Sequence, residues 1–324
     1  MKKGIVKAEI LFSRKCNLKC SYCNMPNGKD NTLSVIDWFT GMEQLKKLDC
    51  KFCAFYGAEP LLEFEKLIHV LPYAENIGID CTLITNGTVS GTKEMLLELN
   101  KGGLKSLTMS YDISALDKSS RLKTDLAVRT LSWFKTLKNV RDVAAVVTLT
   151  NTNYLFLPTA IKMLSKLGIW TFFDMYHWNR YTTGISKCSD QNPLFCFDNH
   201  EKLVEILEEV KTLRNKGFLV HNNDSFIDAV KKDKLSYSWN CAEHKEFPSW
   251  LTIDCDGVVI PCDDFQIRNP KYNITNIYEQ FDEFSKYMKN IVQGMCLGCL
   301  WQTHIGAVEI KKGTESINDY IHGK

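Results

Sequence analysis

The sequence predicts an α/β fold, a partial (β/α)6 TIM-like barrel with a small C-terminal β-hairpin/helix module. Two observations predict it. Over roughly the first 175 residues, short β-branched or aromatic runs alternate with longer segments of helical period, as in a parallel sheet covered by helices. From about residue 233 this alternation gives way to a hairpin-like stretch, "SWLTIDCDGVVIPCDDF", in which Asp256 and Gly257 supply the tight turn.

Six strand–helix repeats are expected, which make an open or partial barrel. The strands are expected at 8–13, 51–56, 80–85, 106–111, 144–149 and 169–174. The helical patterns lie at 34–48, 61–75, 91–99, 117–137 and 155–167. Ser34 and Asp37 form an imperfect capping box at the first helix, and Gly168 follows the last one, where a helix should stop.

Two regions are expected along the chain. Residues 1–222 would form the barrel core together with the long polar connection after residue 174 and a helix at 199–216. Residues 223–324 would form the C-terminal module, which includes the hairpin and a helix at 275–292. The sequence has no internal repeat and no flexible Gly/Ser linker, so we expect the module to dock on the barrel.

The composition excludes some classes of partner. The chain has 324 residues with 44% hydrophobic and 24% charged side chains, and its formal net charge of +2 gives no electrostatic reason to expect nucleic acid or a membrane surface. Neither a signal peptide nor an apolar run of the roughly 20 residues of a membrane span is found, so we expect a cytoplasmic protein. In that compartment the 13 cysteines should be free thiols and metal ligands.

Three of these cysteines crowd the loop after the first strand. The stretch "CNLKCSYC" places Cys16, Cys20 and Cys23 where the ends of parallel strands build active sites in α/β barrels. Three thiolates can hold three corners of a 4Fe-4S cube and leave the fourth iron exposed. The alternatives are a zinc knuckle or cysteines that share no ligand.

The CxxxCxxC motif, with the aromatic Tyr22 before its last cysteine, resembles that of radical S-adenosylmethionine (SAM) enzymes. The resemblance implies a 4Fe-4S cluster on Cys16, Cys20 and Cys23, with SAM chelated by the open iron. An electron, from a flavodoxin- or ferredoxin-like reductant, would cleave SAM to a 5′-deoxyadenosyl radical that abstracts a substrate hydrogen.

Further elements of the same family follow successive strands, and this order is more specific than any one of them. Gly57-Ala58-Glu59-Pro60 is similar to the GGEP element that engages the SAM amino group, with Ala58 in place of the second glycine. The other cofactor-binding residues implied are Asn86 of a "TNG" corner, Ser110 and Asp112 of an "SxD" element, and Arg121 beyond it. Read alone, Gly57–Pro60 is also an ordinary strand-to-helix turn and Asn86-Gly87 an ordinary turn, and none of these elements is specific by itself.

The late cysteines resemble the start of a SPASM or twitch extension, which carries auxiliary iron–sulfur clusters in many radical SAM enzymes. The ligands implied for a second 4Fe-4S cluster are Cys241, Cys262, Cys296 and Cys299. No cysteine follows Cys299, so the single-cluster twitch form matches better. Four thiolates would saturate a cube, which favours electron transfer or a structural role. A tetrathiolate zinc site is the alternative.

Other residues could take part in chemistry. Cys255 could return a hydrogen atom to a substrate radical, His177 could act as acid or base, and Arg180 could clamp a carboxylate or phosphate. An inert thiol, or packing and backbone hydrogen bonding, is the alternative for each. Cys188 and Cys196 are further candidates for the role of Cys255, and one of Asp254, Asp256, Asp263 and Asp264 could accept a proton. By contrast, Cys50, Cys53 and Cys81 are expected in the core.

The function expected is therefore radical SAM chemistry. The resemblance to the SPASM/twitch group favours oxidative modification, crosslinking or epimerisation of a ribosomally made peptide. The barrel begins at once, so a leader peptide would need a separate carrier or direct contact. A small-molecule dehydrogenase or epimerase acting on a sugar, aminoglycoside or nucleoside is the second hypothesis. A non-catalytic zinc-binding scaffold is the third.

Overall fold

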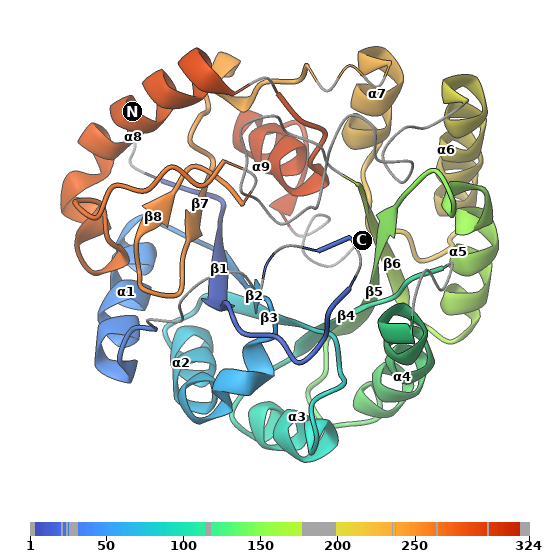
Figure 1. Cartoon of the computed structure of the whole chain (residues 1–324), viewed down its shortest axis with the longest axis horizontal. Helices are drawn as coiled ribbons and strands as arrows, with labels where there is room; N and C mark the ends of the chain where they lie inside the picture. Colours follow the sequence, from blue (N-terminus) through green and yellow to red (C-terminus); the bar gives the residue numbers. More distant parts are fainter. Residues whose placement is uncertain are drawn as a thin grey trace.

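The computed structural model of the chain describes residues 4–20, 22, 23, 25, 32–113, 118–176, 199–234, 236, 238–263, 265–296 and 298–317. Six parallel strands lie side by side in the order of the sequence, as the alternating pattern predicts (Figure 1). They are β1 (Lys7–Ser13), β2 (Phe52–Gly57), β3 (Asp80–Thr85), β4 (Ser106–Ser110), β5 (Asp142–Leu149) and β6 (Trp170–Met175). The predicted partial (β/α)6 barrel is confirmed.

Helices cover the outside of this sheet in a ring (Figure 1). They are α1 (Val35–Lys47), η1 (Pro60–Glu63) with α2 (Phe64–Asn76), α3 (Thr92–Lys101), α4 (Lys118–Phe134), η2 (Tyr154–Phe156) with α5 (Leu157–Lys166), and α6 (His200–Asn215). The expected signals act at their ends: the Ser34 hydroxyl accepts a hydrogen bond from Asp37 N at 3.2 Å, and Gly168 has φ +67° just after α5.

The C-terminal part extends the same sheet. Strand β7 (Trp250–Ile253) pairs in parallel with β1, and β8 (Val259–Ile260) pairs antiparallel with β7, so the sheet order is β6-β5-β4-β3-β2-β1-β7-β8. The predicted hairpin is present, with Gly257 in its turn at φ +83°. The sequence pattern did not predict that the hairpin joins β1 through backbone hydrogen bonds.

Four helical segments complete this region: α7 (Asp224–Asp233), η3 (Cys241–Glu243), η4 (Ile274–Asn276) with α8 (Ile277–Met295), and α9 (Gln302–Lys312). Helix α9 lies between β1 and β6 (Figure 1). His304 Nε2 lies 3.4 Å from Glu9 Oε2 on β1, and Gln302 N donates to Asp174 Oδ1 on β6 at 3.0 Å. Helix α9 therefore bridges the gap between the first and last strands of the barrel.

Within the described part of the chain, no helix combines the length and the apolar character that crossing a lipid bilayer requires.

Candidate active site

The loop after β1 carries the three clustered cysteines. Cys16, Cys20 and Cys23 are half-buried, and two of the sulfurs accept backbone hydrogen bonds within the loop. Leu18 N donates to Cys16 Sγ and Met25 N donates to Cys23 Sγ, each at 3.4 Å. Such N–H···S bonds favour the charged thiolate, which is the form that ligates iron.

The surroundings of Cys16 fit a cationic cluster. Burial raises the pKa of the Cys16 thiol, its bond from Leu18 N opposes this, and the carboxylate of Glu59 and the thiols of Cys20 and Cys23 raise it further. A bound cluster supplies the positive charge that would hold these thiols ionised. Among the described residues no three His, Cys, Asp or Glu side chains converge on one point as ligands of a single ion do. A cube, by contrast, takes each thiolate at a different corner.

Glu59 ties the loop after β2 to the corner after β3. Its buried carboxylate accepts hydrogen bonds from Leu61 N at 3.0 Å, Thr85 Oγ1 at 2.7 Å and Asn86 N at 2.8 Å. Burial raises the pKa of Glu59, and these three donors counteract the rise. Asn86 in turn places its Nδ2 3.7 Å from Cys16 Sγ. Glu59 therefore positions the asparagine that contacts the cysteine loop.

Gly57 brings the end of β2 against the end of β1. It has φ +135°, and a Cβ built on it would overlap the carbonyl oxygen of Ser13. Ala58 N donates to the same oxygen at 2.9 Å. The Ala58 methyl packs beside a small cluster that contains Leu11 and Val258, so the departure from a second glycine is accommodated here.

A buried lysine holds the aromatic residue of the cysteine motif. The Tyr22 hydroxyl lies 2.9 and 3.0 Å from the two carboxylate oxygens of Asp112. Lys123 Nζ lies 2.7 Å from Asp112 Oδ2, donates to the Tyr22 hydroxyl and sits 5.0 Å from the centre of the Tyr22 ring. Burial lowers the pKa of Lys123, but Asp112 and Cys20 raise it more, so its pKa lies above the usual range and it stays charged.

Lys123 was missed in the sequence, although a signal for it existed. It lies one helical turn before the buried Ala127 and two before the buried Leu131, so it is a lysine on the apolar face of α4. Arg121, the cation expected from the family pattern, is exposed on the same helix.

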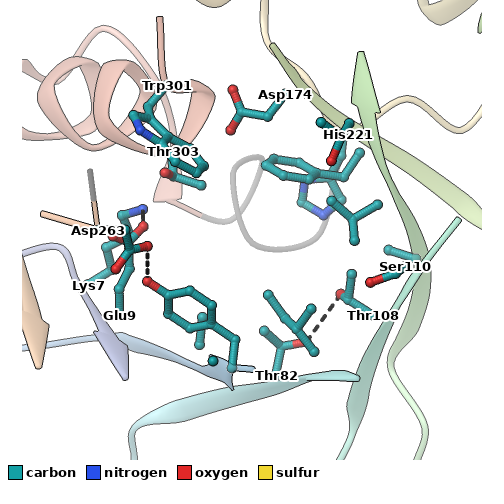
Figure 2. Close-up of a pocket in the computed structure, with 18 of the residues that line it drawn as sticks. Lys7, Glu9, Thr82, Thr108, Ser110, Asp174, His221, Asp263, Trp301 and Thr303 are labelled. Atoms are coloured by element: carbon teal, nitrogen blue, oxygen red, sulfur yellow. Dashed lines mark hydrogen bonds and ion pairs between the residues drawn. The ribbon is translucent and has the colours of Figure 1, made fainter. Parts of the chain in front are cut away.

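The interior of the barrel is hollow, with a cavity of about 320 Å³. Its walls are the alternate, inward-facing residues of β1 to β6 together with residues of the cysteine loop and of the C-terminal part. One wall carries hydroxyl groups, and Figure 2 shows Thr82, Thr108 and Ser110 along it. Figure 2 shows Lys7, Glu9, Asp263 and Trp301 on the other side. Barrel interiors are more often packed with large apolar side chains, so this hollow can receive a ligand.

The side of the cavity that carries Lys7 and Glu9 contains a buried ion pair. Lys7 Nζ lies 2.5 Å from Glu9 Oε1, and both side chains are buried. Burial alone would raise the pKa of Glu9, but Lys7 and His304 hold it well below the usual range. The His304 ring stacks on Trp250, with ring centroids 4.0 Å apart. The sequence pattern did not predict that Lys7 and Glu9 line a cavity.

The late cysteines are partly gathered by the fold. The thiols of Cys241 and Cys296 interact electrostatically, and Cys299 N donates to Trp239 O at 2.9 Å, so the 239–241 and 296–299 segments lie together. Cys262 Sγ accepts from Phe265 N at 3.2 Å, and Cys296 Sγ accepts from Gly298 N at 3.4 Å. These N–H···S bonds repeat the pattern of the first cysteine loop.

The candidates for catalysis have different outcomes. Cys255 is buried in the β7–β8 turn and is not among the residues that line the cavity. Asp263 lines the cavity, where it accepts a hydrogen bond from Tyr56, whereas Asp254 and Asp256 pair with Arg268. The candidates that lie outside the described residues are His177, Arg180, Cys188, Cys196 and Asp264. Cys50, Cys53 and Cys81 lie in the hydrophobic core, as expected.

A comparison with family models decides the family. The model described as "Radical SAM superfamily" matches residues 10–173, just over half of the 324 residues. The chain belongs to the radical SAM superfamily. This membership implies a 4Fe-4S cluster and SAM as cofactors, and it supports an enzyme. The matched range runs from β1 to β6 and so contains the cysteine loop, Glu59, Asn86 and Asp112.

Similar proteins agree with the radical SAM assignment. A GTP 3',8-cyclase of Clostridium botulinum is 31% identical over 105 residues, which is 30% of this chain and 32% of that protein's length. Streptococcus suis SuiB bound to S-adenosylmethionine has a TM-score of 0.62 at 16% identity, over 93% of this chain and 74% of that one. The enzyme anSMEcpe with bound AdoMet and Cp18Cys peptide has a TM-score of 0.59 at 17% identity, over 98% and 99% of the two chains. At these identities the solved structures show the fold.

Proposed function

We propose that Cys16, Cys20 and Cys23 hold a 4Fe-4S cluster with an open iron that binds SAM next to the barrel cavity. When bound, the cluster and SAM supply a 5′-deoxyadenosyl radical, which takes a hydrogen atom from a substrate in the cavity. The observation that carries this proposal is the position of the cysteine loop: its residues Tyr22 and Cys23 line the cavity of the barrel, and hydroxyl and charged side chains also line that cavity.

The chain's own residues would bind and orient these cofactors. Glu59 and Asn86 fix the corner that touches the cysteine loop, and Lys123 with Asp112 fixes Tyr22. Ser110, at the end of the neighbouring strand β4, also lines the cavity. Because every one of these contacts is at least partly buried, they hold Cys16 and Tyr22 in position before any ligand binds.

The late cysteines would hold a second 4Fe-4S cluster in a twitch-like module. The four ligands proposed are Cys241, Cys262, Cys296 and Cys299. Their N–H···S bonds and the proximity of the 239–241 and 296–299 segments support this. A cluster with four thiolates has no open iron, so it would pass electrons, and the reductant proposed for the enzyme is a flavodoxin- or ferredoxin-like protein.

The first substrate class that we propose is a ribosomally made peptide, to be oxidised, crosslinked or epimerised. The support is the shared fold with SuiB bound to precursor peptide SuiA, at a TM-score of 0.61, and with anSMEcpe bound to a peptide. A small polar molecule is the second class, and the hydroxyl groups along one wall of the cavity favour it.

Anaerobic reconstitution followed by reduction in the presence of SAM tests the proposal. We expect about eight iron atoms per chain, from two cubes, and release of 5′-deoxyadenosine. A chain that binds zinc, shows no brown iron–sulfur absorbance and leaves SAM intact would be a metal-binding scaffold and not an enzyme.

A further inference from the structure

A buried lysine of α4 reaches the cysteine loop. Lys123 is 4% exposed, and its ammonium nitrogen lies 2.7 Å from Asp112 Oδ2. The same nitrogen donates a hydrogen bond to the Tyr22 hydroxyl and lies 5.0 Å from the centre of the Tyr22 ring. Because Tyr22 stands between Cys20 and Cys23 in the motif, these contacts bring a cation to the sulfur atoms of the loop.

The ammonium group also contacts one of these sulfur atoms. Burial alone would lower the pKa of Lys123, but Asp112 and Cys20 both attract its charge, accept hydrogen bonds from it and raise the pKa above the usual value. Burial and Asp112 raise the pKa of the Tyr22 hydroxyl, and Cys20 raises it further. Two different side chains therefore place the Cys20 sulfur beside the Lys123–Asp112 ion pair.

The packing of α4 gives little reason for a lysine at this position. Lys123 lies on the face of the helix that also carries Ala127 and Leu131, both fully buried. A charge is costly to bury, and apolar side chains can often replace a buried ion pair without loss of stability. The group that Lys123 faces, and not the stability of the fold, therefore accounts for its charge.

A charge beside a ligand sulfur changes the energy of reducing a cluster. Reduction adds one electron, so a cation hydrogen-bonded to the sulfur stabilises the reduced state and raises the reduction potential. A nearby carboxylate acts with the opposite sign. Lys123 and Asp112 are both buried, so solvent and salt screen their fields less than they screen surface charges.

We propose that Lys123 raises the reduction potential of the cluster on Cys16, Cys20 and Cys23 by donating a hydrogen bond to the Cys20 sulfur. This inference rests on the proposed function, because it concerns the cluster proposed there. Asp112 holds the ammonium group in place and offsets part of its effect. Lys123 thus acts through Cys20, and it makes the transfer of one electron from the flavodoxin- or ferredoxin-like reductant to this cluster more favourable.

Redox titration of the reconstituted protein, followed by EPR without SAM, tests this inference apart from activity. The signal that Cys20→Ala removes belongs to the loop cluster. Lys123→Met removes the cation and should lower the midpoint potential of this signal, whereas Asp112→Asn removes the opposing charge and should raise it. Each shift should correspond to at least a tenfold change in the one-electron equilibrium, which is about 59 mV. Lys123→Arg keeps the charge and should retain most of the wild-type potential.

Two controls separate charge from structure. Tyr22→Phe loses the hydrogen bonds to Lys123 and Asp112 but leaves both charges in place, so it should shift the potential less than either charge variant. Arg129→Gln removes a cation from an exposed position on the same helix and should leave the potential unchanged. Asp112→Asn keeps the lysine, so the test does not depend on whether Lys123→Met folds.

Equal potentials in the wild type and both charge variants, or shifts of the same sign in the two, would overturn the inference. A Lys123→Met variant that changes only the KM for SAM would also overturn it, because the lysine would then act on SAM and not on the cluster. Release of 5′-deoxyadenosine is measured separately. A loop cluster that cleaves SAM but shows no shifts removes only the inference, and one that shows the expected shifts without cleavage removes only the SAM chemistry of the proposed function.

Discussion

The guanidinium of Arg14 forms a two-point ion pair with the carboxylate of Asp254, with Nε–Oδ1 and Nη2–Oδ2 distances of 2.7 Å each. Arg14 lies directly after β1 and two residues before Cys16, and Asp254 directly follows β7. Arg268 also donates to Asp254. The cysteine loop is thus fastened to the hairpin that extends the sheet, and the two parts of the chain share one ion-pair network.

Removing the inner member of this network should cost far more stability than removing the outer one. Asp254 has a side chain 1% exposed, so Asp254→Asn removes the buried charge opposite Arg14, whose side chain is 14% exposed, and should lower the free energy of unfolding by about 3 kcal/mol. Asp256, at 29% exposed, pairs only with Arg268 among its described contacts of this kind, and Asp256→Asn should cost under about 1 kcal/mol. Urea unfolding of both variants measures the difference, and equal costs would contradict the account.

Gly57 should not tolerate a side chain. Gly57→Ala must place a Cβ at φ +135° against the Ser13 carbonyl, so we expect a loss above the roughly 1–2 kcal/mol that a positive φ costs alone. Gly217→Ala is the matched control, because Gly217 has φ +86° and nothing within 4 Å of the added methyl. Denaturant midpoints compare the two, and an equal loss in both variants would show that the approach to Ser13 carries no energy.

Lys123 should matter for SAM cleavage through Tyr22. Lys123→Met leaves Asp112 buried without its cation beside the cysteine loop, and we expect 5′-deoxyadenosine formation to fall more than tenfold and the KM for SAM to rise. Arg129→Gln, an exposed position on the same helix, should leave the rate unchanged. Arg121→Gln should slow 5′-deoxyadenosine formation less than Lys123→Met does. The reverse order would return the role to Arg121.

Sequence patterns predicted the local structure well. The third strand was expected at 80–85 and spans Asp80–Thr85, and the first helix was expected at 34–48 and spans Val35–Lys47. Both depend on periodicity and capping, which are local properties. Helices α7 and α9 and the pairing of β7 with β1 were not expected. The pairing of β7 with β1 and the contact of α9 with Glu9 join segments more than 200 residues apart, which no period in the chain encodes.

Part of the candidate site could be named from the sequence. Motif spacing marks the cysteines, Glu59, Asn86 and Asp112, and the structure places Asn86 beside Glu59 and Cys16, and Asp112 beside Tyr22. His221 and Trp301 were missed, since each reaches the cavity only through packing between distant segments. Lys123 was missed although its position on the apolar face of α4 was a signal. The charged side chains of the cavity, Lys7, Glu9, Asp174 and Asp263, were not predicted to line one hollow, because only the closed barrel brings their segments around it.

The buried Glu9 should make stability depend on acid. Its pKa is held below the ordinary value of 4.5 by Lys7 and His304, so the unfolded chain binds the proton more readily than the folded one. The contribution of Glu9 to the free energy of unfolding should therefore be fully present above about pH 4.5 and be lost as the pH drops below that value. Glu9→Gln should show a flatter acid limb between about pH 5 and pH 3. Parallel slopes for the two proteins would contradict the assignment of this dependence to Glu9.

Release of 5′-deoxyadenosine by single cysteine variants tests the central claim most directly. After anaerobic reconstitution and reduction with SAM present, the unaltered chain should form 5′-deoxyadenosine, whereas Cys16→Ala, Cys20→Ala and Cys23→Ala should form none. Cys53→Ala, which removes a core thiol, is the control for the loss of a cysteine and should retain cleavage wherever it folds. Unchanged cleavage in all three loop variants would show that the cluster which binds SAM lies elsewhere in the chain.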